Sequence, residues 1–384
     1  MEIIKKLIFL VILLIPSLAF ATPTALGSIS ALASGQAHTC AFISGGTVKC
    51  WGNNDNGQLG DGTTVSKKLP VAVSSLTGVA SIGAGADTTC AVVSAALKCW
   101  GGNLYGQIGD TTSLNTKLTA TAVGTLTSGV SSVKVGDGHI CVTTTSNGVK
   151  CLGRNENGQL GNNTIINTKT AVNVTGLTSG VSQIALGGNS SCALITATGG
   201  IKCWGGNDLG QIGDGTYIDR STPVDVSGLT SGYESIWGGG TSAHFCAIKS
   251  SDHTVRCWGE NSSGQLGNGN RVATAVPVTV TGISTATKMI LGNFHTCSVL
   301  LSGAMKCWGQ GIHGQLGNGN QDSLVIVSPS VITTNAVEGV AGSYHTCVKI
   351  TGSVAQCWGM NRDGQLSDDT YLERLTPVDL LESS

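Results

Sequence analysis

The chain has 384 residues, of which 11% are charged and 4% aromatic, and its formal net charge is −1. So small a charge excludes a basic field that would attract nucleic acid or an anionic membrane surface. A hydrophobic content of 40% excludes a disordered chain, and 56 glycines indicate many short strands joined by turns.

The first 21 residues have the layout of a secretory signal peptide. Lys5 and Lys6 precede the apolar run LIFLVILLIPSL, and small residues stand at Ala19 and Ala21. The apolar run is short for a membrane-spanning helix, and no later stretch reaches about 18 uninterrupted apolar residues. We therefore expect cleavage after Ala21, no membrane span, and an exported, soluble chain in the periplasm, at the cell surface or outside the cell.

From residue 28 onward the chain repeats itself about every 51 residues. Each unit has an apolar segment ending in Gly, a strand-like run into a first cysteine, a small-residue turn and a return run through a second cysteine. A polar glycine-rich loop and a closing stretch such as LPVAV follow. Four short β segments per unit predict an all-β fold, a seven-bladed β-propeller of four-stranded repeats.

The repeat boundaries predict one propeller domain over residues 22–384. We place the seven units at 28–78, 79–129, 130–180, 181–232, 233–282, 283–336 and 337–381. Neither end looks like a capping unit, because residues 28–35 match the opening segment of other repeats and residues 376–380 match their closing stretch. A closed ring therefore fits better than an open solenoid, whose edge strands would be exposed.

The repeat resembles that of the regulator of chromosome condensation family. The residues that carry the resemblance are G-x-x-H-T-C-A, then G-x-V-K-C-W-G-x-N-x-x-G-Q-L-G, over essentially all of residues 28–380. The Gly-Gln core recurs at 57–60, 106–109, 158–161, 210–213, 264–267, 314–317 and 364–367, with Ile or Ser replacing a residue in some units. The resemblance implies a seven-bladed propeller but no single function, because the family includes a nuclear exchange factor, an ultraviolet receptor and a secreted β-lactamase inhibitor.

The cysteine spacing predicts one disulfide within each unit. In the first and seventh couples the midpoint falls in the small-residue turn, so the two cysteines face each other across a hairpin, within disulfide reach. Export makes oxidation favourable, whereas zinc binding or buried free thiols are less suitable alternatives. The expected pairs are Cys40–Cys50, Cys90–Cys99, Cys141–Cys151, Cys192–Cys203, Cys246–Cys257, Cys297–Cys307 and Cys347–Cys357.

Three further positions recur. Five units place a histidine two residues before the first cysteine, which we expect to bond to neighbouring backbone rather than to share a metal ion: His38, His139, His244, His295 and His345. Six units place a basic residue before the second cysteine, where it covers blade surface or attracts an anionic partner. The tryptophan after that cysteine, replaced by Leu152 in the third unit, is expected to pack between blades.

No recurring pattern indicates catalysis or a cofactor. The polar loops lack the alternating carboxylates and terminal Glu of a calcium loop, and no Ser/His/Asp order, carboxylate pair or phosphate-binding loop stands out. We therefore expect no catalytic residue, no metal and no cofactor, and we expect the chain not to be an enzyme.

Departures between units provide a hypothesis for a binding site. The fifth unit has a longer segment, IWGGGTSAHFC, with Trp237, while Phe294 and Tyr344 stand three residues before the first cysteines of units six and seven. We expect these three aromatic residues to form an arc on one propeller face that binds a partner. The alternative is that they plug the central channel or pack beside it.

The function expected from these observations is that of a disulfide-stabilised binding or scaffold module, a monomer that contacts a protein or another extracytoplasmic macromolecule through one face. The family resemblance implies two alternatives, a secreted inhibitor of an extracellular enzyme and a guanine-nucleotide exchange factor. The predicted signal peptide separates the chain from the cytosolic GTPases that an exchange factor would need.

Overall fold

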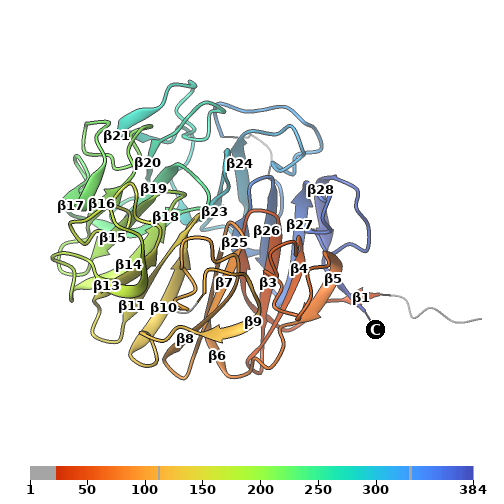
Figure 1. Cartoon of the computed structure of the whole chain (residues 1–384). Coiled ribbons are helices and arrows are strands. Elements are labelled where there is room, and N and C mark those ends of the chain that lie inside the picture. The colour runs from red at the N-terminus through yellow and green to blue at the C-terminus, as the bar shows by residue number, and fades with distance from the viewer. Residues whose placement is uncertain (1–22, 111–112, 328–330, 384) are drawn as a thin grey trace, which may run out of the picture.

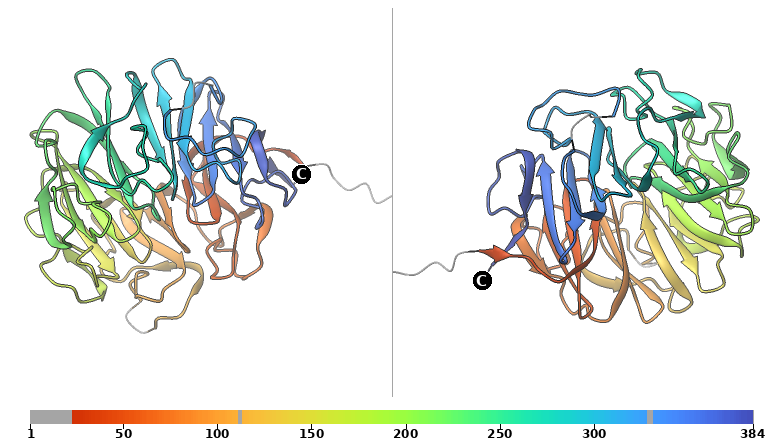
Figure 2. Two further views of the ribbon diagram at one scale, coloured as in Figure 1. Left: turned by 90° about the horizontal axis from the view of Figure 1, so that it is seen from above. Right: turned by 180° about the vertical axis from the view of Figure 1, so that it is seen from behind.

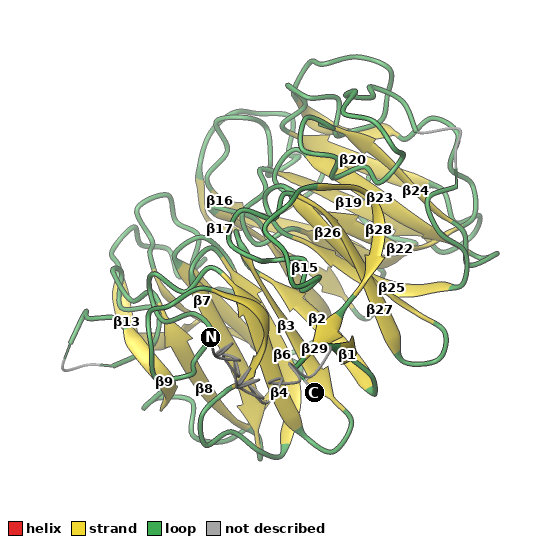
Figure 3. Ribbon diagram, turned by 90° about the vertical axis from the view of Figure 1, so that its right-hand side faces the viewer, coloured by secondary structure: helices red, strands yellow, loops and turns green. Residues whose placement is uncertain are grey.

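Each sequence repeat folds into one antiparallel sheet, and seven sheets surround a central axis (Figure 1). The structure is a computed structural model that describes residues 23–110, 113–327 and 331–383. The predicted signal peptide, residues 1–21, lies outside the described residues. Within them every regular element is a strand (Figure 3), which confirms the all-β, seven-bladed propeller predicted from the repeat.

The strands of each blade follow one another in the chain. Blades one to three contain β2 (Ile29–Ser34), β3 (His38–Ile43), β4 (Thr47–Gly52) and β5 (Lys67–Ala72); β6 (Val79–Gly85), β7 (Thr88–Val93), β8 (Ala96–Gly101) and β9 (Lys117–Ala122); β10 (Val130–Val135), β11 (His139–Thr144), β12 (Val149–Gly153) and β13 (Thr168–Asn173). Blades four and five contain β14 (Val181–Leu186), β15 (Ser190–Ile195), β16 (Gly200–Gly205) and β17 (Arg220–Asp225); β18 (Tyr233–Gly238), β19 (His244–Lys249), β20 (Val255–Gly259) and β21 (Thr274–Thr279). Blades six and seven contain β22 (Ala286–Leu291), β23 (His295–Leu300) and β24 (Met305–Gly309); β25 (Ala336–Ala341), β26 (His345–Ile350), β27 (Val354–Gly359) and β28 (Arg374–Asp379).

The sixth blade departs from the four-stranded pattern. Its sheet has three strands, and at the place of a fourth strand the described residues form a single antiparallel bridge between Gly309 and Leu324. The seventh blade begins at Ala336 with β25, so this strand starts on the last residue that the repeat boundaries assigned to unit six.

The antiparallel order puts two sets of connections at opposite ends of every blade. The first-to-second turns and the long third-to-fourth loops lie at one end, which we call the loop face. Their proximity is visible in a recurring bond, such as that from the Gly102 amide to the Asp87 carbonyl (2.8 Å). The second-to-third turns and the connections between blades form the opposite face.

The ring closes where its two ends meet (Figure 2). The short strand β1 (Thr24–Ala25) pairs with β29 (Leu381–Glu382), which follows the outermost strand of blade seven. The amide of buried Leu26 donates to the Leu380 carbonyl (2.9 Å), and the Lys49 ammonium pairs with the Glu382 carboxylate. Closure therefore combines backbone pairing, a buried leucine and an ion pair.

All seven predicted disulfides are present. Each joins the two central strands of its blade, with the paired cysteines directly opposite in the register and their Cα atoms 4.0–4.1 Å apart. No described cysteine is free. Every cysteine is fully buried, so the disulfides form part of the core.

The tryptophans pack between blades, as predicted. Each of the six tryptophans that follow a second cysteine is fully buried. Its indole Nε1 donates to the backbone carbonyl of the glutamine in the Gly-Gln core of the preceding blade, at 2.9–3.0 Å. The last residue of the Gly-Gln core lies against this indole and has to be glycine in the first blade. A Cβ on Gly60 would lie 2.8 Å from Nε1 of Trp100, and Gly60 has a φ of +69°. The recurrent loop is thus a joint between blades.

The histidines also join blades, but through side chains rather than the backbone bond we expected. The Nε2 atom of each lies 2.8–2.9 Å from a Thr or Ser hydroxyl of the next blade, as in His38 to Thr89. That hydroxyl in turn donates to the same glutamine carbonyl that accepts the tryptophan bond. The hydroxyl is therefore an acceptor for the imidazole, and each histidine carries its proton on Nε2.

The two units that lack the histidine also lack its partner. Thr88 replaces it in blade two, where the next blade has Ile140 at the hydroxyl position. Ser190 replaces it in blade four, where the next blade has Phe245, which stacks on Trp258 with ring centroids 6.1 Å apart. Because donor and acceptor are absent together, neither interface leaves a hydroxyl without its histidine.

Candidate functional sites

Two of the three predicted aromatic residues meet on the loop face. Phe294 and Tyr344 occupy equivalent turns of blades six and seven, and their rings stack with centroids 6.2 Å apart. The ring of His313 packs edge-on against Tyr344 at 5.1 Å, and its Nδ1 lies 2.9 Å from a Glu373 carboxylate oxygen. Both aromatic rings are half-buried, so this aromatic pair presents an apolar surface on a rigid support.

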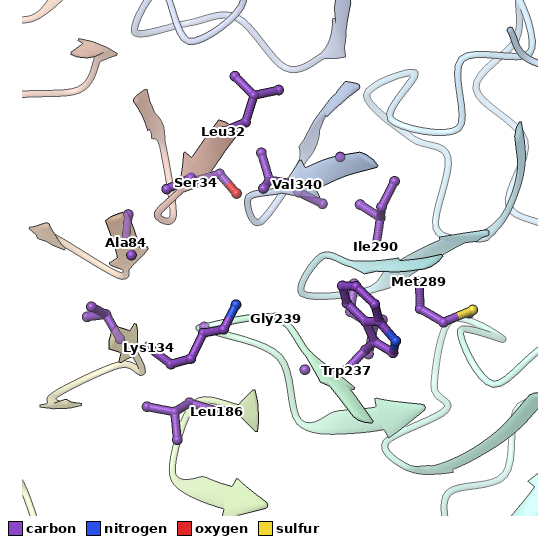
Figure 4. A pocket seen from close by; sticks show the side chains of 18 of the residues that line it. Leu32, Ser34, Ala84, Lys134, Leu186, Trp237, Gly239, Met289, Ile290 and Val340 are labelled. Atoms are coloured by element: carbon purple, nitrogen blue, oxygen red, sulfur yellow. The ribbon is translucent and has the colours of Figure 1, made fainter. Parts of the chain in front are cut away.

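Trp237 lies elsewhere, in the lining of the central channel (Figure 4). It is on the innermost strand of blade five, opposite Cys246, and not on the turn that carries Phe294 and Tyr344. Its indole Nε1 donates to Ser235 (2.9 Å), and the Lys288 ammonium lies 5.7 Å from its ring centroid. Trp237 therefore lines the channel and does not join the aromatic pair.

The channel contains a cavity of about 110 Å³ lined by the innermost strands of all seven blades. At the level of Trp237 the equivalent positions, each opposite the first cysteine of its blade, are Ala33, Gly83, Lys134, Ala185, Ile290 and Val340. At this level of the channel, Lys134 is the charged residue and Trp237 is the aromatic residue. Both side chains extend into the cavity (Figure 4). The surrounding protein lowers the pKa of the Lys134 ammonium, with a smaller opposing effect from Glu338.

The insertion in the fifth unit crosses the end of the channel at the loop face. A Cβ on Gly239 would lie 2.1 Å from the Leu291 carbonyl of blade six, and one on Gly240 would lie 2.6 Å from the Val135 carbonyl of blade three. Only glycine can approach backbone on both sides so closely. The glycine-rich insertion of the fifth unit therefore forms a plug across the propeller axis.

A larger pocket of about 590 Å³ lies on the loop face, over blades one to three. We define the acidic pocket by six of its lining residues, Asn56, Asp87, Leu104, Tyr105, Leu114 and Asp137. Burial raises the pKa of both aspartate carboxyls; nearby carboxylates raise that of Asp87 further, and Arg154 partly lowers that of Asp137. The acidic pocket could not be inferred from the repeat pattern because its residues come from three separate units.

The long loops also expose a ring of aliphatic side chains. The eighth residue after the first glycine of each Gly-Gln core is aliphatic in six units and 47–72% exposed; these residues, the aliphatic ring, are Val65, Leu114, Ile166, Ile218, Val272 and Leu372. In four of them the carbonyl accepts a bond from a buried Asn side chain, for example from Asn155 to Ile166 (3.2 Å). The backbone is therefore fixed while the side chain faces solvent.

The sixth unit lacks both parts of this arrangement. Gly311 stands where the other units have the buried Asn, and Asp322 stands where they have the aliphatic residue. A Cβ on Gly311 would lie 2.0 Å from the Asp322 carbonyl, so the loop backbone itself occupies the space of the missing side chain. The repeated aliphatic residue in an otherwise polar loop was a sequence signal for this ring.

The recurrent basic residues beside the second cysteine are half-buried along the blades. Two of them form ion pairs, Lys49 with Glu382 and Lys202 with Asp225 (2.7 Å). Over residues 23–110, 113–327 and 331–383, no cluster of three or more His, Cys, Asp or Glu side chains is arranged to hold a metal ion. The same part of the chain has no helix of the length and apolarity needed to cross a membrane.

Comparison with known proteins identifies the family. The model of the RCC1-like domain matches residues 16–348, which is most of the chain. The chain belongs to the RCC1-like domain family. This confirms the resemblance seen in the repeat.

Curated relatives of this RCC1-like chain share fewer than a third of its residues. It is 28% identical over 261 residues to the ultraviolet-B receptor UVR8 of Arabidopsis thaliana, covering 67% of this chain and 58% of that receptor. It is 29% identical over 291 residues to the human E3 ubiquitin-protein ligase HERC2, covering 72% of this chain and 6% of the ligase. The chain thus corresponds to only part of each relative.

Solved structures confirm the fold of this RCC1-like chain. Human WBSCR16 superposes with a TM-score of 0.77 at 21% identity, covering 87% of this chain and 94% of that protein. Yeast RCC1 (Prp20), in its complex with Kap60, superposes with a TM-score of 0.75 at 17% identity, covering 86% and 83%. At these identities the likeness shows the fold alone.

Proposed function

We propose that this chain is an exported, disulfide-stabilised propeller that binds a protein through its loop face and acts by binding rather than by catalysis. The observation that carries the proposal is the aliphatic ring, in which six apolar side chains stand in solvent on loops whose backbone is fixed from within. Exposed apolar side chains on a rigid surface are typical of protein-binding sites. The aromatic pair adds two rings to the same face.

Export is supported by two features. The first 21 residues have the composition of a signal peptide, and seven disulfides persist in oxidising compartments rather than in a reducing cytosol. An exported chain would meet its partner outside the cytoplasm. The buried Asn side chains hold the backbone of the binding loops, which lowers the entropy lost on association.

A capture experiment with matched variants tests the proposal. The chain without residues 1–21 is immobilised and exposed to the native extracytoplasmic fraction, beside a variant with Ile166→Ser, Ile218→Ser and Leu372→Ser. A control variant, Leu301→Ser and Val337→Ser, removes apolar side chains that are 62% and 41% exposed away from the loops of the loop face. We expect the parent chain and the control to retain the same partner and the loop-face variant to lose it. Equal capture by all three would refute the proposal.

A further inference from the structure

The loop face is acidic. In the described residues, its first-to-second turns and third-to-fourth loops contain fifteen Asp and Glu residues and three Arg residues. Six basic residues occupy the first two positions of the adjoining outermost strands, and adding them still leaves an excess of six acidic residues. On the opposite face, the described residues of the connections include a single carboxylate, Asp252. The molecule is close to neutral, yet its two faces differ in charge.

Several loop carboxylates are neutralised by these basic residues. The recurring pairs join a carboxylate just after the Gly-Gln core to a cation at the start of the fourth strand, as in Asp110 with Lys117 (2.5 Å) and Asp214 with Arg220 (2.6 Å). Asp87 has no cation within ion-pair distance among the described residues, and its bonds come from the amides of Asn56 (3.1 Å) and Gln58 (3.5 Å).

The acidic pocket is built around this carboxylate. Asp87 and Asp137 stand on the first-to-second turns of adjacent blades, and the exposed side chains of Leu104 (70%) and Leu114 (47%) form apolar walls. Tyr105 supplies an aromatic wall. The pocket therefore combines carboxylates with apolar and aromatic side chains in one lining, a combination that suits a cation on an aliphatic stem.

One wall already holds a guanidinium. The Arg154 side chain lies over the Tyr105 ring, 5.0 Å from its centroid, and 3.9 Å from an Asp137 oxygen. Its stronger partner is Glu156 at 2.9 Å, outside the pocket. Arg154 thus shows that this wall is suited to a planar cation, while Asp87 stays without one.

The pKa of Asp87 agrees with an uncompensated charge. Burial raises this pKa most, followed by the carboxylates of Asp137 and Asp55, and the Asn56 bond lowers it only in part. A cation placed beside Asp87 would offset both causes and bring its pKa down again.

We propose that the acidic pocket receives a basic side chain, arginine or lysine, from the protein that binds the loop face. The identity of the donor rests on the proposed function, but the pocket itself does not. Its carboxylates would bind the cationic group, and its leucines and tyrosine would cover the methylene stem. The acidic field of the whole face would select partners with a basic contact surface and accelerate their association.

Methyl NMR with small probes tests the pocket without knowledge of the partner. The full chain without residues 1–21, labelled in its leucine methyl groups, is titrated with Nα-acetyl-arginine methylamide, the lysine analogue, and the neutral citrulline analogue. We expect Leu104 and Leu114 methyl shifts with the two cations and not with citrulline. The pKa of the Asp87 carboxyl, followed by its carbon shift, should fall in the presence of either cation.

Matched variants show whether the carboxylates cause the binding. Asp87→Asn with Asp137→Asn should reduce affinity for the basic probes at least tenfold and keep the fold, because an amide oxygen still accepts the Asn56 bond. Asp208→Asn with Asp322→Asn removes the same charge from exposed sites on other blades of this face and should change affinity less than twofold. Equal losses in both variants would overturn the proposal in favour of a diffuse field.

Other occupants give distinguishable results. A Leu104 and Leu114 response to calcium but to neither basic probe would overturn the proposal and identify a cation site instead. If the basic probes fail while the aliphatic-ring variant still abolishes capture, the pocket proposal is wrong and the proposed function stands. If the probes bind the pocket but the aliphatic-ring variant captures the partner as well as the parent chain does, the pocket proposal stands and the proposed function is wrong.

Discussion

Five buried histidines link stability to pH at the level of single residues. Each has its Nε2 bonded to a hydroxyl of the next blade, while its Nδ1 has no partner among the described residues. Burial lowers the pKa of four of them from 6.5 to about 3 and that of His345 to about 4, with smaller effects from neighbouring charges on His38, His139 and His295. The folded chain therefore keeps these imidazoles neutral at pH values where the unfolded chain protonates them.

The direction of the pH effect follows from this difference. Above pH 6.5 both states are unprotonated and the stability is fully present. Below it the unfolded state gains protons that the folded state does not, so stability falls down to about pH 4 for His345 and about pH 3 for the other four histidines. Each histidine contributes at most about 1.4 kcal/mol per pH unit to this slope. We predict a steep loss of unfolding free energy between pH 6 and 5 in denaturant titrations.

Replacing two of these histidines should weaken that slope. Glutamine retains an Nε2 donor without a titrating group, so His139→Gln with His244→Gln should reduce the slope by about two fifths. The measurement is the free energy of unfolding at several pH values for the parent and the variant. Identical slopes would show that the imidazoles are protonated in the folded state.

At the level of elements, each central hairpin is closed by one disulfide. The closed loops span 9–11 residues in the sequence, and loop entropy for such lengths gives about 2–3 kcal/mol each. We predict that Cys246→Ala with Cys257→Ala lowers the unfolding free energy by about this amount while leaving six disulfides intact, as a non-reducing peptide map would confirm. Crosslinks between cysteines of different blades in that map would contradict the assigned pairing.

Hairpins were the most predictable elements. Cysteines equidistant from a turn must face each other on antiparallel strands, so the pairing could be inferred from spacing alone, and repetition of the tryptophan indicated its packing role. The histidine partner was missed because a hydroxyl one blade away is about 51 residues distant in sequence. Trp237 was misplaced because the glycine insertion after it shifts the alignment of unit five against units six and seven.

The candidate sites were less predictable for the same physical reason. The acidic pocket combines Asp87 with Asp137 across two blades, and only the packing of neighbouring turns brings their charges together. By contrast, Phe294 and Tyr344 occupy equivalent positions in consecutive units, so their meeting followed from the repeat. Contacts between equivalent positions can be inferred from a repeat sequence, whereas contacts between different positions depend on the geometry between blades.

At the scale of the whole molecule, the two faces have different chemistry. The loop face combines the aliphatic ring, the aromatic pair and an excess of carboxylates, and the unit-five plug closes the channel on this side. The described connections of the opposite face are almost uncharged. This asymmetry is the basis for placing the partner on the loop face.

Photo-crosslinking shows which face of the propeller the captured partner contacts. A benzoylphenylalanine is introduced at Ile166 on the loop face in one variant and at Leu301 on the opposite face in another, positions with similar exposure of 72% and 62%. We expect a covalent adduct with the partner from position 166 and none from position 301. An adduct from position 301 alone would contradict it.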